Sequence, residues 1–178
     1  MGARNVFGFI HSRYPDRTGG QTAARVRIGR VEPVTVSTTV SKPRQEVFEF
    51  LDVLANHEGF MDHLFTKWSF SGPARGVGAK ARATVHAPGS REIAEFEVVE
   101  AEAPSLLVER GVSAHGKRET RGTYRLEEQP GGGTKISFEL AWETVPRSER
   151  LFPPLARRFI RRANGKAMRR LAKQLERG

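Results

Sequence analysis

Apolar and polar residues alternate through most of the middle of the chain, which is the pattern of half-buried β-strands. The alternation is clearest at residues 34–40, 79–85, 92–100 and 134–142, and shorter runs occur at 68–70, 106–110 and 120–126. Turns containing Gly or Pro separate these runs, for example at Gly72-Pro73 and Pro88-Gly89. The pattern therefore predicts an antiparallel meander of about seven strands with one apolar face.

Two short helices are expected between the first and second strands. Ser41 stands where a side chain can cap free amides, and Pro43 falls in the first turn, where its missing N–H costs nothing. The buried side of this helix is expected to consist of Val47, Phe48, Phe50, Leu51 and Leu54. Residues 52–61 are expected to form a second short helix or turn.

The last thirty residues predict one long helix, from about 148 to 177. Its apolar residues recur every four positions and mark one slowly drifting face: Leu151, Leu155, Phe159, Ala163, Ala167, Leu171 and Leu175. Such a stripe needs an apolar surface to cover it. The sequence therefore predicts an α+β fold in which a curved antiparallel sheet wraps this helix, with two short helices after the first strand.

Composition fits a globular protein, with 38% hydrophobic and 28% charged residues among 178. There is no cysteine, which excludes disulfides, thiolate catalysis, iron–sulfur clusters and cysteine-bound zinc. The apolar patch at residues 6–10 is too short for a signal peptide, and no run is long enough for a transmembrane helix. A cytoplasmic location is the expectation.

The net charge of +10 is unevenly distributed along the chain. Residues 1–30 carry six arginines and one aspartate, and residues 147–178 carry eleven basic and two acidic residues, whereas the middle is mildly acidic. Residues 1–30 also lack any helical or strand periodicity. They are expected to be a basic, poorly ordered extension, followed by one domain over residues 31–178.

Several short motifs, in this order, resemble the START-like superfamily that includes polyketide cyclases and dehydrases (SRPBCC). The resemblance lies in Ser41-Lys42-Pro43 followed by Val47-Phe48, Asn56-His57-Glu58, Trp68, Gly76-Val77-Gly78, Glu97-Val98-Val99, Thr134 and residues 171–176. It covers residues 32–177 and implies a helix-grip fold. The superfamily contains lipid carriers, receptors for hydrophobic ligands and aromatase/cyclases, so the resemblance leaves the activity open.

The resemblance implies an elongated apolar cavity between the concave face of the sheet and the long helix. A curved sheet cannot lie flush along a straight helix, which agrees with this expectation. Tyr124 and Trp142 would each add a polar group to the apolar surface. The residues expected to line the cavity are Phe60, Trp68, Phe70, Ala83, Val85, Phe96, Val98, Tyr124, Phe138, Leu140, Trp142, Leu155 and Phe159.

Binding of a hydrophobic or lipid-like small molecule, without catalysis and without a cofactor, is the favoured function. A polyketide-type aromatase/cyclase or dehydratase is the alternative, and it requires ionisable groups that point into the cavity. Arg82, His86, Glu119 and Arg121 are the candidates on strands, but alternation turns Arg82 and His86 toward solvent. No catalytic residue is therefore assigned.

Two other motifs carry less weight. His57, Glu58, Asp62 and His63 cluster in the sequence, but their spacing fits a polar lid at the cavity mouth better than a metal site. Residues 76–81 fit a loose dinucleotide fingerprint, yet a strand and not a helix follows them.

The arginine-rich side of the long helix suggests a third function, docking on an anionic membrane or RNA. The residues concerned are Arg157, Arg158, Arg161, Arg162, Arg169 and Arg170. A solvated basic face is the simpler interpretation. No metal and no stable protein partner is predicted.

Overall fold

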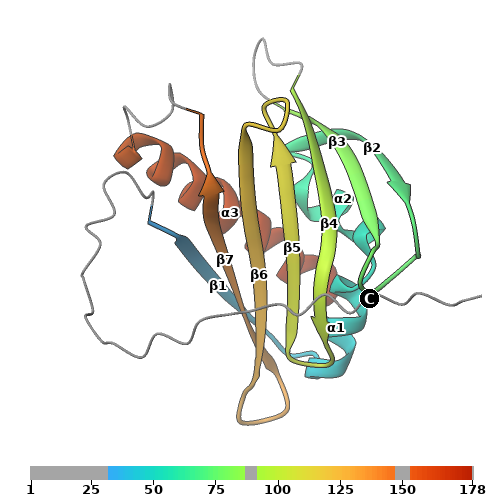
Figure 1. The fold of residues 1–178 in the computed structure, drawn as a ribbon. Helices are drawn as coiled ribbons and strands as arrows, with labels where there is room; N and C mark the ends of the chain where they lie inside the picture. The colour runs from blue at the N-terminus through green and yellow to red at the C-terminus, as the bar shows by residue number, and fades with distance from the viewer. Residues whose placement is uncertain (1–31, 87–91, 147–152, 178) are drawn as a thin grey trace, which may run out of the picture.

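The computed structural model describes residues 32–86, 92–146 and 153–177 (Figure 1). The predicted extension, residues 1–30, lies outside the described residues. The elements in chain order are β1 (Val34–Val40), α1 (Arg44–Leu51), a 3-10 turn η1 (Leu54–Asn56), α2 (His57–Met61), β2 (Phe65–Ser71), β3 (Lys80–Val85), β4 (Ile93–Glu102), β5 (Leu106–Ser113), β6 (Arg118–Glu128), β7 (Thr134–Thr144) and α3 (Pro153–Leu175).

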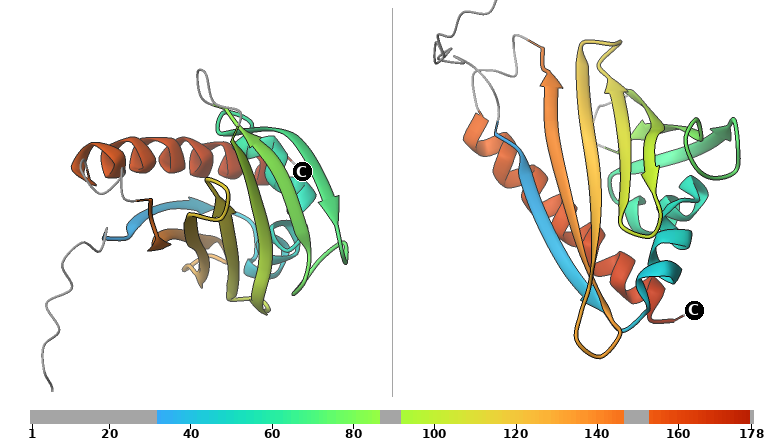
Figure 2. Two further views of the ribbon diagram at one scale, coloured as in Figure 1. Left: turned by 45° about the horizontal axis from the view of Figure 1, so that its top comes forward. Right: turned by 60° about the horizontal axis from the view of Figure 1, so that its bottom comes forward.

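The seven strands form one antiparallel sheet in the order β1-β7-β6-β5-β4-β3-β2. Consecutive strands from β2 to β7 are neighbours, whereas β1 pairs with β7 at the far edge. The chain crosses from one edge strand, β1, to the other, β2, through α1, η1 and α2. Figure 2 shows the sheet curving around α3, which lies along its concave side. The predicted helix-grip fold is confirmed.

The helix α3 buries one stripe of side chains against β1 and α2. Ala163, Ala167, Leu171 and Leu175 of the predicted stripe are buried, with Leu171 fully so. The prediction that Phe159 belongs to the buried stripe is wrong, because 64% of this residue is exposed. A repeat of four drifts about 40° per step on a helix of 100° per residue, so Phe159 lies about 80° from Ala167 while Ile160 lies about 20° away. No helix in the described ranges is long and apolar enough to cross a membrane.

The predicted cap at Ser41 is also wrong. Pro43 occupies the N-cap position of α1, and no side chain caps this helix. Ser41 instead bonds the end of α3, where its backbone N and its Oγ both donate to the Glu176 carboxylate at 2.5 Å. These hydrogen bonds lower the pKa of Glu176 from its ordinary value. Ser41 therefore ties the first crossover to the last helix.

Candidate functional site

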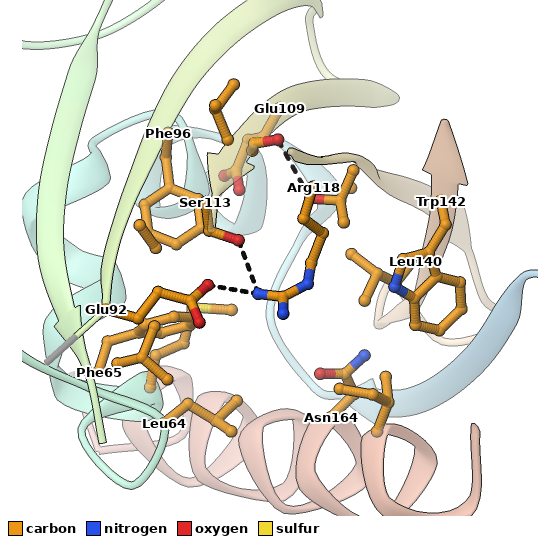
Figure 3. A pocket seen from close by; sticks show the side chains of 18 of the residues that line it. Leu64, Phe65, Glu92, Phe96, Glu109, Ser113, Arg118, Leu140, Trp142 and Asn164 are labelled. Atoms are coloured by element: carbon orange, nitrogen blue, oxygen red, sulfur yellow. Dashed lines mark hydrogen bonds and ion pairs between the residues drawn. The ribbon is translucent and has the colours of Figure 1, made fainter. Parts of the chain in front are cut away.

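A cavity of about 380 Å³ lies between the concave face of the sheet and α3. Its wall consists of inward-facing side chains of β2 to β7, Met61 at the end of α2 with Leu64 just after it, and Phe159, Ile160 and Asn164 of α3. Most of these side chains are apolar, and Figure 3 shows a few polar ones among them. A volume of this size falls within the range of small-molecule sites.

Two glycines on the inner face of the sheet keep this space open. Gly111 of β5 and Gly122 of β6 both line the cavity, and neither puts a side chain into it. A Cβ at Gly122 would approach the Phe138 ring to 3.1 Å, and a Cβ at Gly111 would clash with Thr120 Oγ1. The helix α3 packs mainly on β1 and α2, so it leaves the inner face of the central strands uncovered near Gly111 and Gly122. The hollow therefore follows from small residues opposite the helix.

Aromatic rings close one side of the cavity. Phe96 of β4 makes an edge contact with Phe65 at 5.0 Å between ring centroids and stacks on Trp68 at 5.8 Å. Strict alternation would put Phe65 and Trp68 on opposite faces of β2. The pairing of β2 with β3 shifts register between Thr66 and Ser69, and Lys67 adopts a positive φ there. This bulge brings both rings to one face.

Arg118, at the start of β6, points into the cavity beside two partners (Figure 3). Its Nη1 contacts the Glu92 carboxylate and donates to Ser113 Oγ at 2.9 Å. Glu92 Oε1 also accepts the backbone N–H of Ala114 at 3.0 Å. The guanidinium and the carboxylate neutralise each other, so this polar group brings hydrogen-bonding capacity without net charge.

Glu109 of β5 is a buried carboxyl group in the cavity wall. Its Oε1 lies 3.3 Å from His57 Nδ1, although the geometry does not form a hydrogen bond. His57 is itself buried, and its Nε2 is 2.8 Å from the Leu51 carbonyl oxygen. Burial raises the pKa of Glu109 from its ordinary value, and the nearby His57 opposes this shift. Glu109 is therefore a carboxyl group that holds a proton more readily than one in water.

Tyr124 and Asn164 add two more buried polar groups. The Tyr124 ring packs against Phe138 and His57, and its hydroxyl finds no hydrogen-bond partner among the described residues. Burial, followed by the charge of Glu109, raises the pKa of Tyr124 well above its ordinary value. Asn164 of α3 lines the cavity, and its buried Nδ2 has no hydrogen-bond partner among the described residues. An unused amide donor at a cavity wall marks a place where a ligand acceptor fits.

The structure brings together only part of the predicted lining. Val85, Phe96, Phe138, Leu140, Trp142 and Phe159 line the cavity. Phe60, Ala83, Val98 and Tyr124 are buried in the adjoining core, and Trp68 packs against that core through Phe96. Phe70 is 43% exposed at the edge strand. Leu155 lies in α3, but its side chain is outside the described residues.

Three of the ionisable candidates on the strands lie on the outer face of the sheet. Glu119 and Arg121 form ion pairs there, with Arg110 at 2.7 Å and Glu100 at 3.1 Å. Arg82 faces outward as alternation predicts, and it pairs with Glu95 at 3.9 Å. None of these three can act on a molecule inside the cavity.

His86 follows the end of β3 and is exposed, as expected, but it also lines the cavity at its rim. Sequence reasoning missed Arg118, Glu109 and Asn164. Arg118 alternates in step with Tyr124 on the same strand, so the assignment of Tyr124 to the inner face was a signal that could have identified Arg118.

The acidic and histidine cluster near α2 is not a polar lid. His57 lies in the core, while Asp62 and His63 contact Arg170 of α3. Among the described residues, no group of three or more His, Cys, Asp or Glu side chains is placed to hold a metal ion.

Comparison with known proteins supports the same fold. A family model described as polyketide cyclase / dehydrase and lipid transport matches residues 31–176. The chain is similar to a solved structure from Thermus thermophilus, with 16% identity, a TM-score of 0.62 and coverage of 81% of this chain and 97% of that one. It is also similar to the Zhui aromatase/cyclase from Streptomyces sp. R1128, with 16% identity, a TM-score of 0.61 and coverage of 82% and 94%.

A third similar structure is Ara h 8.0201, with 11% identity, a TM-score of 0.62 and coverage of 83% of this chain and 99% of that one. No curated protein sequence matches the chain. At these identities the structural similarities establish the fold.

Proposed function

The chain belongs to the polyketide cyclase / dehydrase and lipid transport family, within the START-like superfamily, and on that premise we propose that it binds an apolar small molecule in the cavity between the sheet and α3. The observation that carries the proposal is the cavity itself, about 380 Å³ with a mainly apolar wall. Binding there requires no cofactor, because the wall already combines apolar surface with a few polar groups that can orient a ligand.

The charges around the cavity favour a neutral ligand. Arg118 is paired with Glu92, and Glu109 contributes either a neutral carboxyl or a negative charge. Among the described residues that line the cavity, an anionic ligand would therefore find no excess positive charge, and it would face Glu109. The unused Asn164 amide favours a ligand with an oxygen acceptor. The ligand class that fits is a neutral, oxygen-bearing apolar molecule, in preference to a fatty acid.

Two fluorescent probes that differ by one charged group test this assignment. We expect N-phenyl-1-naphthylamine, which is neutral, to bind at least about tenfold more tightly than its sulfonated analogue 1-anilinonaphthalene-8-sulfonate, because burying the sulfonate costs desolvation without a compensating cation. Fluorescence titration measures both affinities. Tighter binding of the sulfonate would refute the neutral ligand class, and binding of neither probe would count against a cavity open to ligands.

A cyclase or dehydratase activity is the second candidate, and Glu109 is the observation that favours it. The carboxyl group stands in the cavity wall with a raised pKa and with His57 behind it. As a carboxylate it would accept a proton from the carbon next to a ligand carbonyl. The electron pair of that C–H bond would form a C=C bond as the π pair of the C=O bond moves to the oxygen, where the Asn164 N–H is available to donate to the enolate.

Hydrogen exchange on a simple bicyclic ketone separates catalysis from binding. If the second candidate is right, the protein in D₂O accelerates uptake of deuterium at the carbon next to the carbonyl of 1-tetralone, measured by mass spectrometry. Glu109→Gln is expected to abolish this acceleration and to retain binding of N-phenyl-1-naphthylamine, because the amide keeps the shape but accepts no proton. Exchange at the buffer rate in the unaltered protein would exclude proton abstraction from this ketone. Ligand binding without catalysis would then remain as the proposed function.

A further inference from the structure

The solvent side of α3 carries a dense stripe of positive charge. Arg158, Arg162, Lys166, Arg169 and Lys173 are all exposed. At 100° per residue these five side chains fall within an arc of about 80°, opposite the buried stripe centred on Leu171. Arg161 is exposed to one side of the arc.

This stripe has no neutralising partners within the described part of the chain. Arg157 pairs with Glu32 and Arg170 with Asp62, so the structure removes two of the six predicted arginines from the free face. None of the exposed basic residues of the stripe forms an ion pair with a described residue. The helix itself contains no acidic residue from Pro153 to Leu175. Like charges four residues apart, as at Arg158 and Arg162, repel each other.

Phe159 stands beside this stripe at one end of the helix. Its side chain is 64% exposed, yet it also lines the cavity, so it forms part of the cavity rim. It lies about 60° around the helix from Arg162 and about 20° from Lys166. The apolar face of α3 is buried in the protein, but the exposed Phe159 beside the arginines gives its outer face both kinds of contact that a membrane interface accepts, with charged headgroups and with the apolar region below them.

We propose that the exposed face of α3 docks on an anionic lipid bilayer, with the basic stripe on the headgroups and the Phe159 ring inserted below them. Docking in this way would bring the rim of the cavity to the bilayer surface. The stripe supplies the electrostatic attraction, and Phe159 supplies the apolar contact that a purely electrostatic site lacks. This inference rests on the helix surface and does not depend on what the cavity binds.

Two other possible partners of the basic face of α3 fit less well than a bilayer. Residues 1–30 carry a net charge of +5, from six arginines and one aspartate, and like charges oppose their seating on a basic face. Single-stranded RNA is usually held by several aromatic rings on which bases stack, whereas Phe159 is the sole aromatic residue of α3. A bilayer matches both the charge and the single apolar side chain.

Vesicle flotation with the full chain tests the docking. We expect binding to phosphatidylcholine vesicles that contain roughly 30% phosphatidylglycerol, no binding to pure phosphatidylcholine, and weaker binding as NaCl rises from about 50 to about 300 mM. Arg158→Glu with Arg162→Glu should weaken binding at least about tenfold, and Phe159→Ser about tenfold. The control Arg82→Glu with Lys135→Glu makes the same change in net charge on exposed side chains of the sheet and should bind as the unaltered protein does.

A second readout follows Phe159 directly. Phe159→Trp should shift its fluorescence to shorter wavelength on anionic vesicles and be quenched by brominated lipid chains, because the ring enters the apolar region. The proposal is overturned if anionic vesicles do not bind at low salt or if both double variants lose binding equally. It is also overturned if the arginine variants lose binding to polyuridine while vesicle binding is unaffected.

Discussion

Replacing His57 by leucine is expected to lower the free energy of unfolding by about 3 kcal/mol or more near neutral pH. The reason is that Glu109 is left buried without the group that favours its charged form. The loss should be smaller below about pH 4.5, where Glu109 is neutral in both the folded and unfolded protein. Chemical denaturation at several pH values measures the difference between the two proteins.

The sign of the pH dependence follows from the raised pKa of Glu109. A carboxyl group whose pKa is raised by folding contributes most stability below its ordinary pKa and loses that contribution as pH rises through the folded value. His57→Leu raises the folded pKa further, so the variant loses stability over a wider range as pH increases. Glu109→Gln is the control, because it should remove this part of the pH dependence. A cost of His57→Leu that does not change with pH would contradict the coupling.

Ala83→Trp is expected to destabilise the protein by about 1–3 kcal/mol or more, whereas Val85→Trp should cost less and abolish binding of N-phenyl-1-naphthylamine. The two residues lie two positions apart on β3 and point to the same face. Ala83 is 1% exposed in the packed core and does not line the cavity, while Val85 does. Added bulk therefore clashes at one position and fills empty space at the other.

Thermal or chemical unfolding gives the stability of each variant, and fluorescence titration gives the binding. The comparison is internal, because the same side chain is added to the same strand. Equal destabilisation at both positions would mean that the space near Val85 is closed in solution. Unchanged probe binding in a stable Val85→Trp variant would place the probe elsewhere.

Much of the fold is predictable because alternation and turn residues act locally. The periods at 34–40 and 134–142 and in the last thirty residues predict two strands and a long helix, and the structure places these as β1, β7 and α3. The phase of α3 is not recovered at its start, since a repeat of four diverges from 3.6 over several turns. The role of Ser41 depends on Glu176, which is distant in sequence, so a capping rule that considers only neighbouring residues does not predict it.

The site is less predictable than the fold because irregular pairing decides which side chains point inward. The bulge in β2 groups Phe65 with Trp68, and the end of β3 turns His86 to the cavity rim. Glu109 belongs to a strand whose inner face is not assigned from sequence, and its partner His57 comes from a helix far away in the chain. Regular alternation from Tyr124 does reach Arg118, so this residue could have been predicted.

Native mass spectrometry of the purified protein, with organic extraction of bound molecules, shows whether the cavity holds a ligand. We expect a species heavier than the chain by one small neutral, oxygen-bearing molecule, and we expect this species to be lost in Val85→Trp. A protein that carries nothing and also fails to bind N-phenyl-1-naphthylamine would have no ligand-binding cavity between the sheet and α3.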